Sequence, residues 1–253
     1  MATVCITGAA GGIGLAVAEA FAGRGDTVTG VDARGPELEA AMAGLGARAL
    51  VADLADPGCA EVVERAVALA GPVDVLVNAA GIYPATPLAD MTAAAWDRVQ
   101  DVNVRAPVLL TLAVARSGRP AAVVNISSGA ATRARPGAAH YCTSKAALEM
   151  ATKACAVELA AQGVRVNAVA PGFVEVASPV NPVTPEYAAA VAVNPLGRPG
   201  HADEIAAAVV WLASAEAAFV TGAVLRVDGG ATAGTTALPI HHPTTTVLQE
   251  GLP

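Results

Sequence analysis

The chain has 253 residues, 54% of them hydrophobic, with a formal net charge of −7 and a pI near 5.0. This length and apolar content suit one α/β domain with a large core, and the lack of any Lys/Arg cluster argues against DNA or RNA as a partner. The N-terminus has no basic segment, and no apolar run of ~20 residues escapes charges, Gly or Pro, so we expect neither a signal peptide nor a membrane span.

Four cysteines, Cys5, Cys59, Cys142 and Cys155, are scattered along the chain. They form no C-x-x-C pair and have no His at ligand spacing, which argues against a zinc site and against a disulfide framework. Free thiols fit a reducing compartment. We therefore expect a soluble, cytoplasmic protein without a metal site.

The N-terminal segment has the pattern of a strand, a glycine turn and a helix. Residues 3–7 form a short β-rich apolar run, and residues 13–21 place apolar side chains on one helical face. Gly8, Gly12 and Gly14 lie in the turn, where they let the backbone approach a pyrophosphate and leave N–H groups at the helix N-terminus to bind it. Because the strict G-x-G-x-x-G spacing is absent, a tight turn without a ligand is the alternative.

The next predicted strand, residues 27–31, ends at Asp32. At about 20 residues beyond the glycine turn, a carboxylate would accept hydrogen bonds from an adenosine ribose. It would also repel a 2′-phosphate, which favours NAD over NADP. Arg34 is close enough in sequence to offset part of that repulsion.

Strands and helices alternate along the remaining chain. The predicted strands are residues 48–52, 73–77, 121–126, 164–169 and 223–227, and the predicted helices are residues 60–69, 92–114, 138–161 and 202–212. The helix from residue 92 is expected to bend and continue past Pro107. The alternation predicts βαβ units in a doubly wound, mostly parallel seven-stranded sheet with helices on both faces. The candidate functional residues then lie at the carboxyl ends of strands, where such sheets bind ligands.

We expect one nucleotide-binding catalytic domain over residues 1–230. The Pro-rich segment from about 173 to 199, with a short helical piece near Tyr187, is predicted to be a mobile substrate loop. Residues 231–253 are irregular and are predicted to form an appended C-terminal tail.

Tyr141 and Lys145 lie four residues apart on the predicted helix 138–161, so a phenol and an ammonium project from one face. A nearby cation favours phenolate and lowers a tyrosine pKa that is ~10 in water. Such a tyrosine can exchange a proton with an alcohol near neutral pH. Taken alone the pair is weak, because a helical Tyr with a Lys one turn later is usually a partly solvated face.

These motifs, in this order, resemble those of the short-chain dehydrogenase/reductase family. The stretch from Thr7 to Gly14 is similar to the family's T-G-x-x-x-G-x-G loop, and Tyr141 with Lys145 matches its Y-x-x-x-K. Further matches, over residues 3 to about 230, are Asn78-Ala79-Ala80-Gly81, Asn103, Ser128 and Pro171-Gly172. One departure is Val176, which stands where the family usually has a Thr that binds the nicotinamide carboxamide.

The resemblance implies a single-domain Rossmann fold and a catalytic set of Asn103, Ser128, Tyr141 and Lys145. Ser128 would steady the charge on the substrate oxygen, and Tyr141 would take the alcohol proton. Lys145 would bind the nicotinamide ribose, and Asn103 would hold a water that connects Lys145 to solvent. The alternatives are a loop-satisfying hydroxyl for Ser128 and an ordinary buried amide at a helix bend for Asn103.

The implied cofactor is NAD, with NADP less expected, and Asp53 is similar to the acidic residue that holds the adenine amino group. The residues expected to contact the cofactor are Gly8, Gly12, Ile13, Gly14, Asp32, Asp53, Leu54, Asn78, Ala79, Gly81, Tyr141, Lys145, Pro171, Gly172 and Val174. The resemblance also implies a homotetramer in which the helices carrying Asn103 and Tyr141 pack across one interface.

Tyr83, Ala130, Phe173 and the following loop would line a mostly apolar pocket, which favours a small to medium cyclic or aromatic alcohol or ketone. Arg133 and Arg135 could meet a carboxylate, although loop arginines are more often solvated.

We therefore expect an NAD-dependent oxidoreductase that interconverts a secondary alcohol and a ketone. The alternatives are a dihydrodiol dehydrogenase that aromatises a cyclic diene-diol, whose ring carboxylate would engage Arg133 or Arg135, and an NADPH-dependent 3-oxoacyl reductase. A dinucleotide-sensing binding protein would have a broken catalytic set, whereas here the set is complete.

Overall fold

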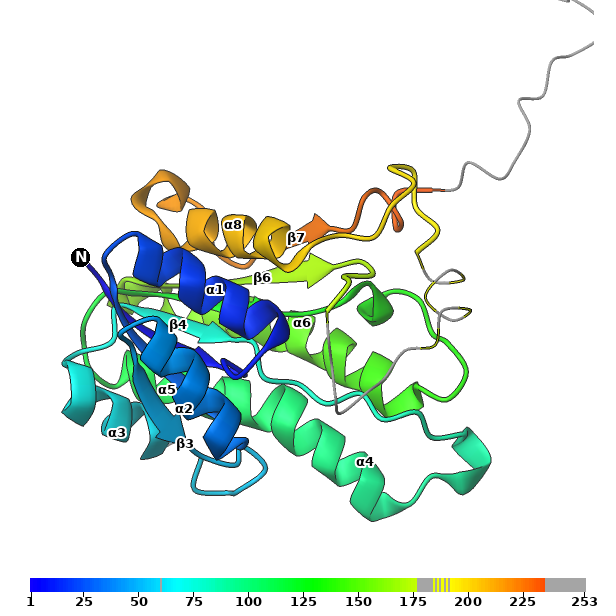
Figure 1. Ribbon diagram of the computed structural model, residues 1–253, viewed down its shortest axis with the longest axis horizontal. Coiled ribbons are helices and arrows are strands. Elements are labelled where there is room, and N and C mark those ends of the chain that lie inside the picture. The colour runs from blue at the N-terminus through cyan, green and yellow to red at the C-terminus, as the bar shows by residue number, and fades with distance from the viewer. Residues whose placement is uncertain are drawn as a thin grey trace, which may run out of the picture.

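The computed structural model describes residues 1–59, 61–176 and 192–234, together with four single residues between 184 and 190. Its centre is one seven-stranded sheet in the order β3-β2-β1-β4-β5-β6-β7, in which every pairing is parallel (Figure 1). The strands are β1 Thr3–Thr7, β2 Thr27–Asp32, β3 Arg48–Val51, β4 Val75–Asn78, β5 Ala121–Ile126, β6 Val164–Pro171 and β7 Val224–Val227. The predicted seven-stranded parallel sheet is confirmed.

Helices cover both faces of the sheet, as predicted. The helices are α1 Gly12–Gly23, α2 Gly35–Gly44, α3 Glu61–Ala70, α4 Ala93–Gln100, α5 Ala106–Ala115, α6 Ala139–Leu159 and α8 Ala202–Ala213. One core cluster lies between the sheet and α1, α2 and α8, and a second lies between the sheet and α3, α5 and α6 (Figure 1). In the described part of the chain, no helix has the length and apolarity needed to cross a bilayer.

Helix α2 is not among the helices predicted from the sequence. The signals for this helix are nonetheless present: Pro36 and Glu37 lie in the first turn, and Leu38 and Met42 are buried one turn apart. Met42 packs so tightly on β2 that a Cβ on Gly30 would lie 2.4 Å from its sulfur.

The predicted long helix from residue 92 continues past Pro107, with a π-turn inside it. Thr92 caps α4 by accepting a hydrogen bond from the Ala95 N–H at 3.2 Å. A π-helical turn, η2 Asp101–Arg105, then joins α4 to α5. Pro107 lies near the start of α5, and the residues before it are already helical. The missing N–H of Pro107 therefore falls inside one continuous helical stretch that contains the π-turn.

The strand order reverses direction between β1 and β4, and this is where open parallel sheets bind ligands. Of the predicted substrate loop, Glu186, Ala188 and Ala190 are helical. Tyr187, residues 177–183 and the tail from residue 235 lie outside the described residues.

Candidate active site

The glycine turn between β1 and α1 has a geometry that only glycine permits. Gly8 and Gly12 have φ of 72° and 55°, in the left-handed region. A Cβ on Gly14 would lie 2.2 Å from the Gly8 carbonyl oxygen, and one on Gly8 would lie 2.8 Å from the Ala80 nitrogen. The half-buried backbone at the start of α1 fits a phosphate cradle. Val176, where the family usually has Thr, lies against this turn, 3.8 Å from the position of a Cβ on Gly12.

Asp32 and Arg34 form a closed pair at the end of β2. One Asp32 oxygen accepts from the Ala10 N–H at 3.2 Å and the other from the Arg34 N–H at 3.0 Å. The Arg34 side chain donates to both oxygens at 3.2 Å. The carboxylate that would read the adenosine ribose is thus partly neutralised by the arginine. Asp53 is more open, since its side chain is 52% exposed and pairs with Arg98 at 3.4 Å.

Two predicted cofactor residues, Asn78 and Leu54, have side chains that are turned into the protein, and their part in cofactor binding stays a prediction. The Asn78 amide donates to the Asn125 Oδ1 at 2.8 Å, and the Asn125 amide donates to the Thr152 hydroxyl at 2.9 Å. This chain of buried amides ties β4, β5 and α6 together beneath the site. Leu54 is likewise buried, in the core cluster under β3.

The remaining predicted cofactor residues lie at the carboxyl edge of the sheet or on the glycine turn. Five of them are half-buried or exposed: Ile13, Ala79, Gly81, Gly172 and Val174. The sixth, Pro171, is buried. Gly172 must remain small, because a Cβ there would lie 2.9 Å from the Asp228 Cα.

Asn103 lies in the π-turn and is fully buried. Its Oδ1 accepts from the Ile82 N–H at 2.9 Å, and its amide donates to the Ile82 carbonyl at 2.9 Å and to the Ser144 hydroxyl at 3.0 Å. Both amide hydrogens are therefore used to join the loop after β4 to α6. Its predicted part in holding a water stays a prediction.

Lys145 is buried on α6, and its ammonium donates to the Ile126 carbonyl at 2.8 Å. Burial lowers the pKa of Lys145 from 10.5 to about 8. The loop after β4 closes on this group, because a Cβ on Gly81 would lie 3.5 Å from both the Lys145 Nζ and the Asn103 Oδ1. The backbone at Gly81 therefore lies beside both polar side chains.

Burial raises the pKa of Tyr141, while the neighbouring Ser128 hydroxyl and the charge of Arg135 act to lower it. The expected net lowering of this pKa is wrong, because the effect of burial is the largest. The Lys145 ammonium is turned toward Ile126 and lies 5.9 Å from the centroid of the phenol ring. The Ser128 hydroxyl also accepts from the Ala130 N–H at 3.1 Å. Ser128 thus both satisfies the loop and approaches Tyr141.

Tyr141 is flanked by two side chains from different loops. The Tyr83 ring centroid lies 5.7 Å from that of Tyr141, with the planes tilted by 54°. The Arg135 guanidinium carbon lies 5.7 Å from the same Tyr141 centroid. Sequence reasoning favoured solvated arginines, but only Arg133 is exposed, whereas Arg135 is half-buried against Tyr141.

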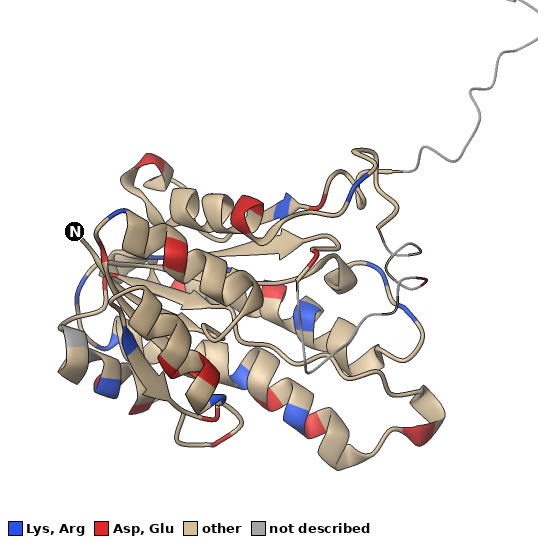
Figure 2. Cartoon of the chain, in the orientation of Figure 1, with Lys and Arg blue, Asp and Glu red and all other residues tan. Residues whose placement is uncertain are grey.

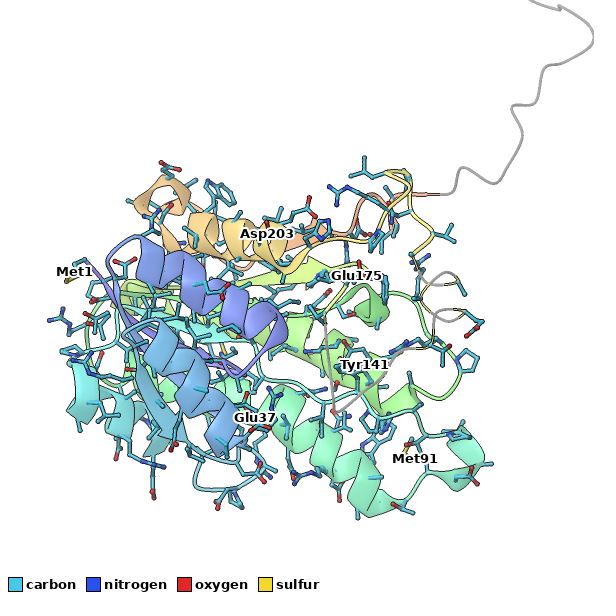
Figure 3. All side chains as sticks on the ribbon, in the orientation of Figure 1. Met1, Glu37, Met91, Tyr141, Glu175 and Asp203 are labelled. Carbon is cyan, nitrogen blue, oxygen red and sulfur yellow. The ribbon has the colours of Figure 1, made fainter. Side chains whose placement is uncertain are left out.

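Figure 3 shows Tyr141 toward the same end of the sheet as Glu175, which follows β6.

Behind the site lies an ionic contact that the sequence analysis missed. Ser127 donates to Glu149 at 2.9 Å, and Glu149 pairs with Arg226 of β7 at 3.6 Å. Glu149 follows Lys145 by one helical turn, so its place on the same face of α6 was the available signal.

Residues 8–232 match the family model described as enoyl-(acyl carrier protein) reductase. The 3-oxoacyl-[acyl-carrier-protein] reductase of Thermotoga maritima is 40% identical over 239 residues, covering 90% of this chain and 96% of that protein. A blue fluorescent protein from a metagenomic library, in complex with NADPH, has a TM-score of 0.84 and 36% identity, covering 90% of this chain and 97% of that one. A 4-hydroxyisoleucine dehydrogenase complexed with NADH has a TM-score of 0.84 and 30% identity, covering 93% and 100%.

Proposed function

Because the chain belongs to the short-chain dehydrogenase/reductase family of oxidoreductases acting on CH–OH groups, we propose that it interconverts a secondary alcohol and a ketone with NAD, using Tyr141 as the general acid and base. The observation that carries this proposal is the convergence of Asn103, Ser128, Tyr141 and Lys145 next to the glycine turn.

The glycine turn would hold the pyrophosphate of the dinucleotide, and Asp32 would accept from its adenosine ribose. A nicotinamide cofactor held by these residues would supply the hydride chemistry, as acceptor in oxidation and as donor in reduction. In oxidation, the Tyr141 oxygen takes the hydroxyl proton while the carbon–oxygen double bond forms. In reduction, the same phenol gives that proton to the carbonyl oxygen.

Ser128 donates to the reacting oxygen and stabilises its negative charge in both directions. Lys145, with a pKa of about 8, exchanges protons close to neutral pH and is suited to return a proton to the phenolate. Asn103 holds Ser144 and the loop after β4 in place around Lys145, and we propose that a water at this point links Lys145 to solvent.

The first test is separate fluorescence titration of the purified protein with NADH and NADPH. We expect NADH to bind at least ten-fold more tightly, ~1.4 kcal/mol, because the Asp32 carboxylate would face a 2′-phosphate. Turnover of secondary alcohols with NAD should then be lost in Tyr141→Phe while NADH binding is kept. Activity that persists in this variant would contradict the proposed acid and base.

A second candidate is an NADPH-dependent 3-oxoacyl reductase, which the 40% identity to the Thermotoga maritima reductase favours. The Arg34 guanidinium beside Asp32 also supports it, because a cation there would attract a 2′-phosphate. Tighter binding of NADPH, with reduction of a 3-oxoacyl thioester, would select this candidate.

We further propose that the protein forms a homotetramer through the exposed face of α6. Val157 and Met150 on this face are 82% and 63% exposed, which is costly for apolar side chains in water. A shallow hollow lined by Val108, Leu112 and Ala151 lies beside them, between α5 and α6. The cytoplasmic location stays a prediction.

A further inference from the structure

The two loops that enclose Tyr141 each bring one side chain of a different chemical kind to it. Tyr83 comes from the loop after β4, and its aromatic ring is tilted by 54° to the ring of Tyr141. Arg135 comes from the loop between β5 and α6 and presents a guanidinium. Both are centred 5.7 Å from the Tyr141 ring, so an aromatic surface and a positive charge lie within one small molecule's length of the phenol.

The loop that carries Arg135 is positively charged, whereas the whole protein is negatively charged. The chain carries a net charge of −7, yet residues 127–138 contain Arg133 and Arg135 and no acidic residue. Figure 2 shows blue without red along this loop. An anion that approaches an acidic protein is repelled at long range, and a positive charge held beside the reacting group opposes this repulsion locally.

Arg135 is the more informative of the two because it is half-buried while Arg133 is exposed. The planar fork of donors on a guanidinium matches the two oxygens of a carboxylate. Partial burial strengthens such a contact by excluding water from it.

We propose that Tyr83 and Arg135 form a substrate subsite for a ring that carries a carboxylate, so that the substrate is an anionic cyclic or aromatic alcohol or ketone. The substrate ring packs on Tyr83, its carboxylate accepts from Arg135, and its reacting oxygen meets Tyr141 and Ser128. The proposal rests on the proposed function, since it names the substrate class for the same site. It disfavours a neutral acyl thioester, which offers Arg135 no carboxylate.

The charge of Arg135 also acts to lower the pKa of Tyr141, so this arginine can influence the phenol as well as bind the substrate. The two parts differ in what they predict. An arginine that only tunes Tyr141 changes the pH profile equally for charged and neutral substrates. An arginine that binds the substrate discriminates between a carboxylate and an uncharged molecule of the same shape.

The test is equilibrium binding of benzoate and of benzamide to the protein saturated with NADH, followed by nucleotide fluorescence. The two probes share ring and size and differ in charge. We expect benzoate to bind at least ten-fold more tightly to the native protein. Arg135→Met should remove this preference, and Arg135→Lys, which keeps the charge but loses the fork, should retain part of it.

Two control variants make the result specific. Arg133→Met, on the same loop, should leave the benzoate preference unchanged, and Tyr83→Leu should weaken both probes by a similar factor. The proposal is overturned if the native protein binds the two probes equally, if Arg133→Met acts like Arg135→Met, or if Arg135→Met shifts only the pH profile. Failure of the proposed function is distinct: it would appear as alcohol turnover that survives Tyr141→Phe, whatever the probes do.

Discussion

The Lys145 ammonium donates to the carbonyl oxygen of Ile126 at 2.8 Å, which ties α6 to the last residue of β5. Ser128 lies two residues further along the chain, so this contact fixes the distance between the helix that carries Tyr141 and the loop that carries Ser128. Because the ammonium is buried, its contribution to stability depends on pH.

We predict that the stability of the native protein relative to Lys145→Met rises with pH. The folded pKa is about 8 and the unfolded one 10.5, so the unfolded chain binds more protons between these values. The cost of the buried charge is full below pH 8 and is relieved as pH rises, by ~1.4 kcal/mol per unit. Urea unfolding of both proteins at pH 7 and pH 9.5 measures the difference. A gap independent of pH would mean that the pKa is not lowered.

Gly14→Ala should destabilise the fold and abolish NADH binding. The new Cβ would lie 2.2 Å from the Gly8 carbonyl oxygen, so the glycine turn must open. Overpacking of this kind costs ~1–3 kcal/mol. Gly23→Ala is the matched control in the same helix, because nothing lies within 4 Å of its Cβ. It should be neutral or stabilise by up to ~1 kcal/mol and bind NADH normally.

The raised pKa of Tyr141 gives the two reaction directions opposite pH dependence. Oxidation needs phenolate as the base, so its kcat/KM should rise with pH into the alkaline range. Reduction needs the neutral phenol, so its kcat/KM should fall there. Ser128→Ala removes a group that lowers the pKa and should move both inflections to higher pH, in addition to slowing turnover. Ser127→Ala, whose hydroxyl bonds Glu149 instead, should not move them.

Asp32→Ala should shift the cofactor preference toward NADPH by at least ten-fold. The substitution removes the carboxylate that repels a 2′-phosphate and releases the Arg34 guanidinium that now pairs with it. Asp53→Ala is the control, because Asp53 is expected at the adenine and would change both affinities alike. Paired NADH and NADPH titrations decide the matter, and an unchanged ratio in Asp32→Ala would rule out Asp32 as the ribose reader.

Val157→Glu should break self-association, because it places a charge on the apolar face of α6 that we propose to be covered. Leu88→Glu, also at an exposed apolar residue but outside α6, should leave the assembly intact. Sedimentation velocity of the three proteins gives the assembly directly. A native protein that sediments as a monomer or a dimer would refute the proposed homotetramer.

Much of the architecture could be predicted because it depends on local signals. Buried parallel strands appear as short apolar runs, and the glycines that follow β1 are required by the turn that they form. The continuation of the helix past Pro107 was anticipated, but the π-turn was not, since a π-turn has no clear sequence pattern. Helix α2 was missed because its short apolar stripe, Leu38 and Met42, is weak until β2 is placed beside it.

The surroundings of Tyr141 were harder to predict because they arise from separate loops. The spacing of Tyr141 and Lys145 placed both on one face, yet it could not show that the ammonium turns to Ile126. In the same way, nothing in the sequence distinguishes Arg135 from Arg133. Only the path of the loop makes one of them a neighbour of the phenol and leaves the other in solvent.

The π-turn at Asn103 also determines how α5 is rotated about the helix axis relative to α4. Each residue of an α-helix turns the chain by about 100°, so removing one residue from Asp101–Arg105 would rotate everything that follows by that angle. Asn103 could then no longer face Ile82 while Leu110 and Val114 face the sheet. The additional residue in this turn allows one continuous stretch of helix to serve a polar site at one end and an apolar core at the other.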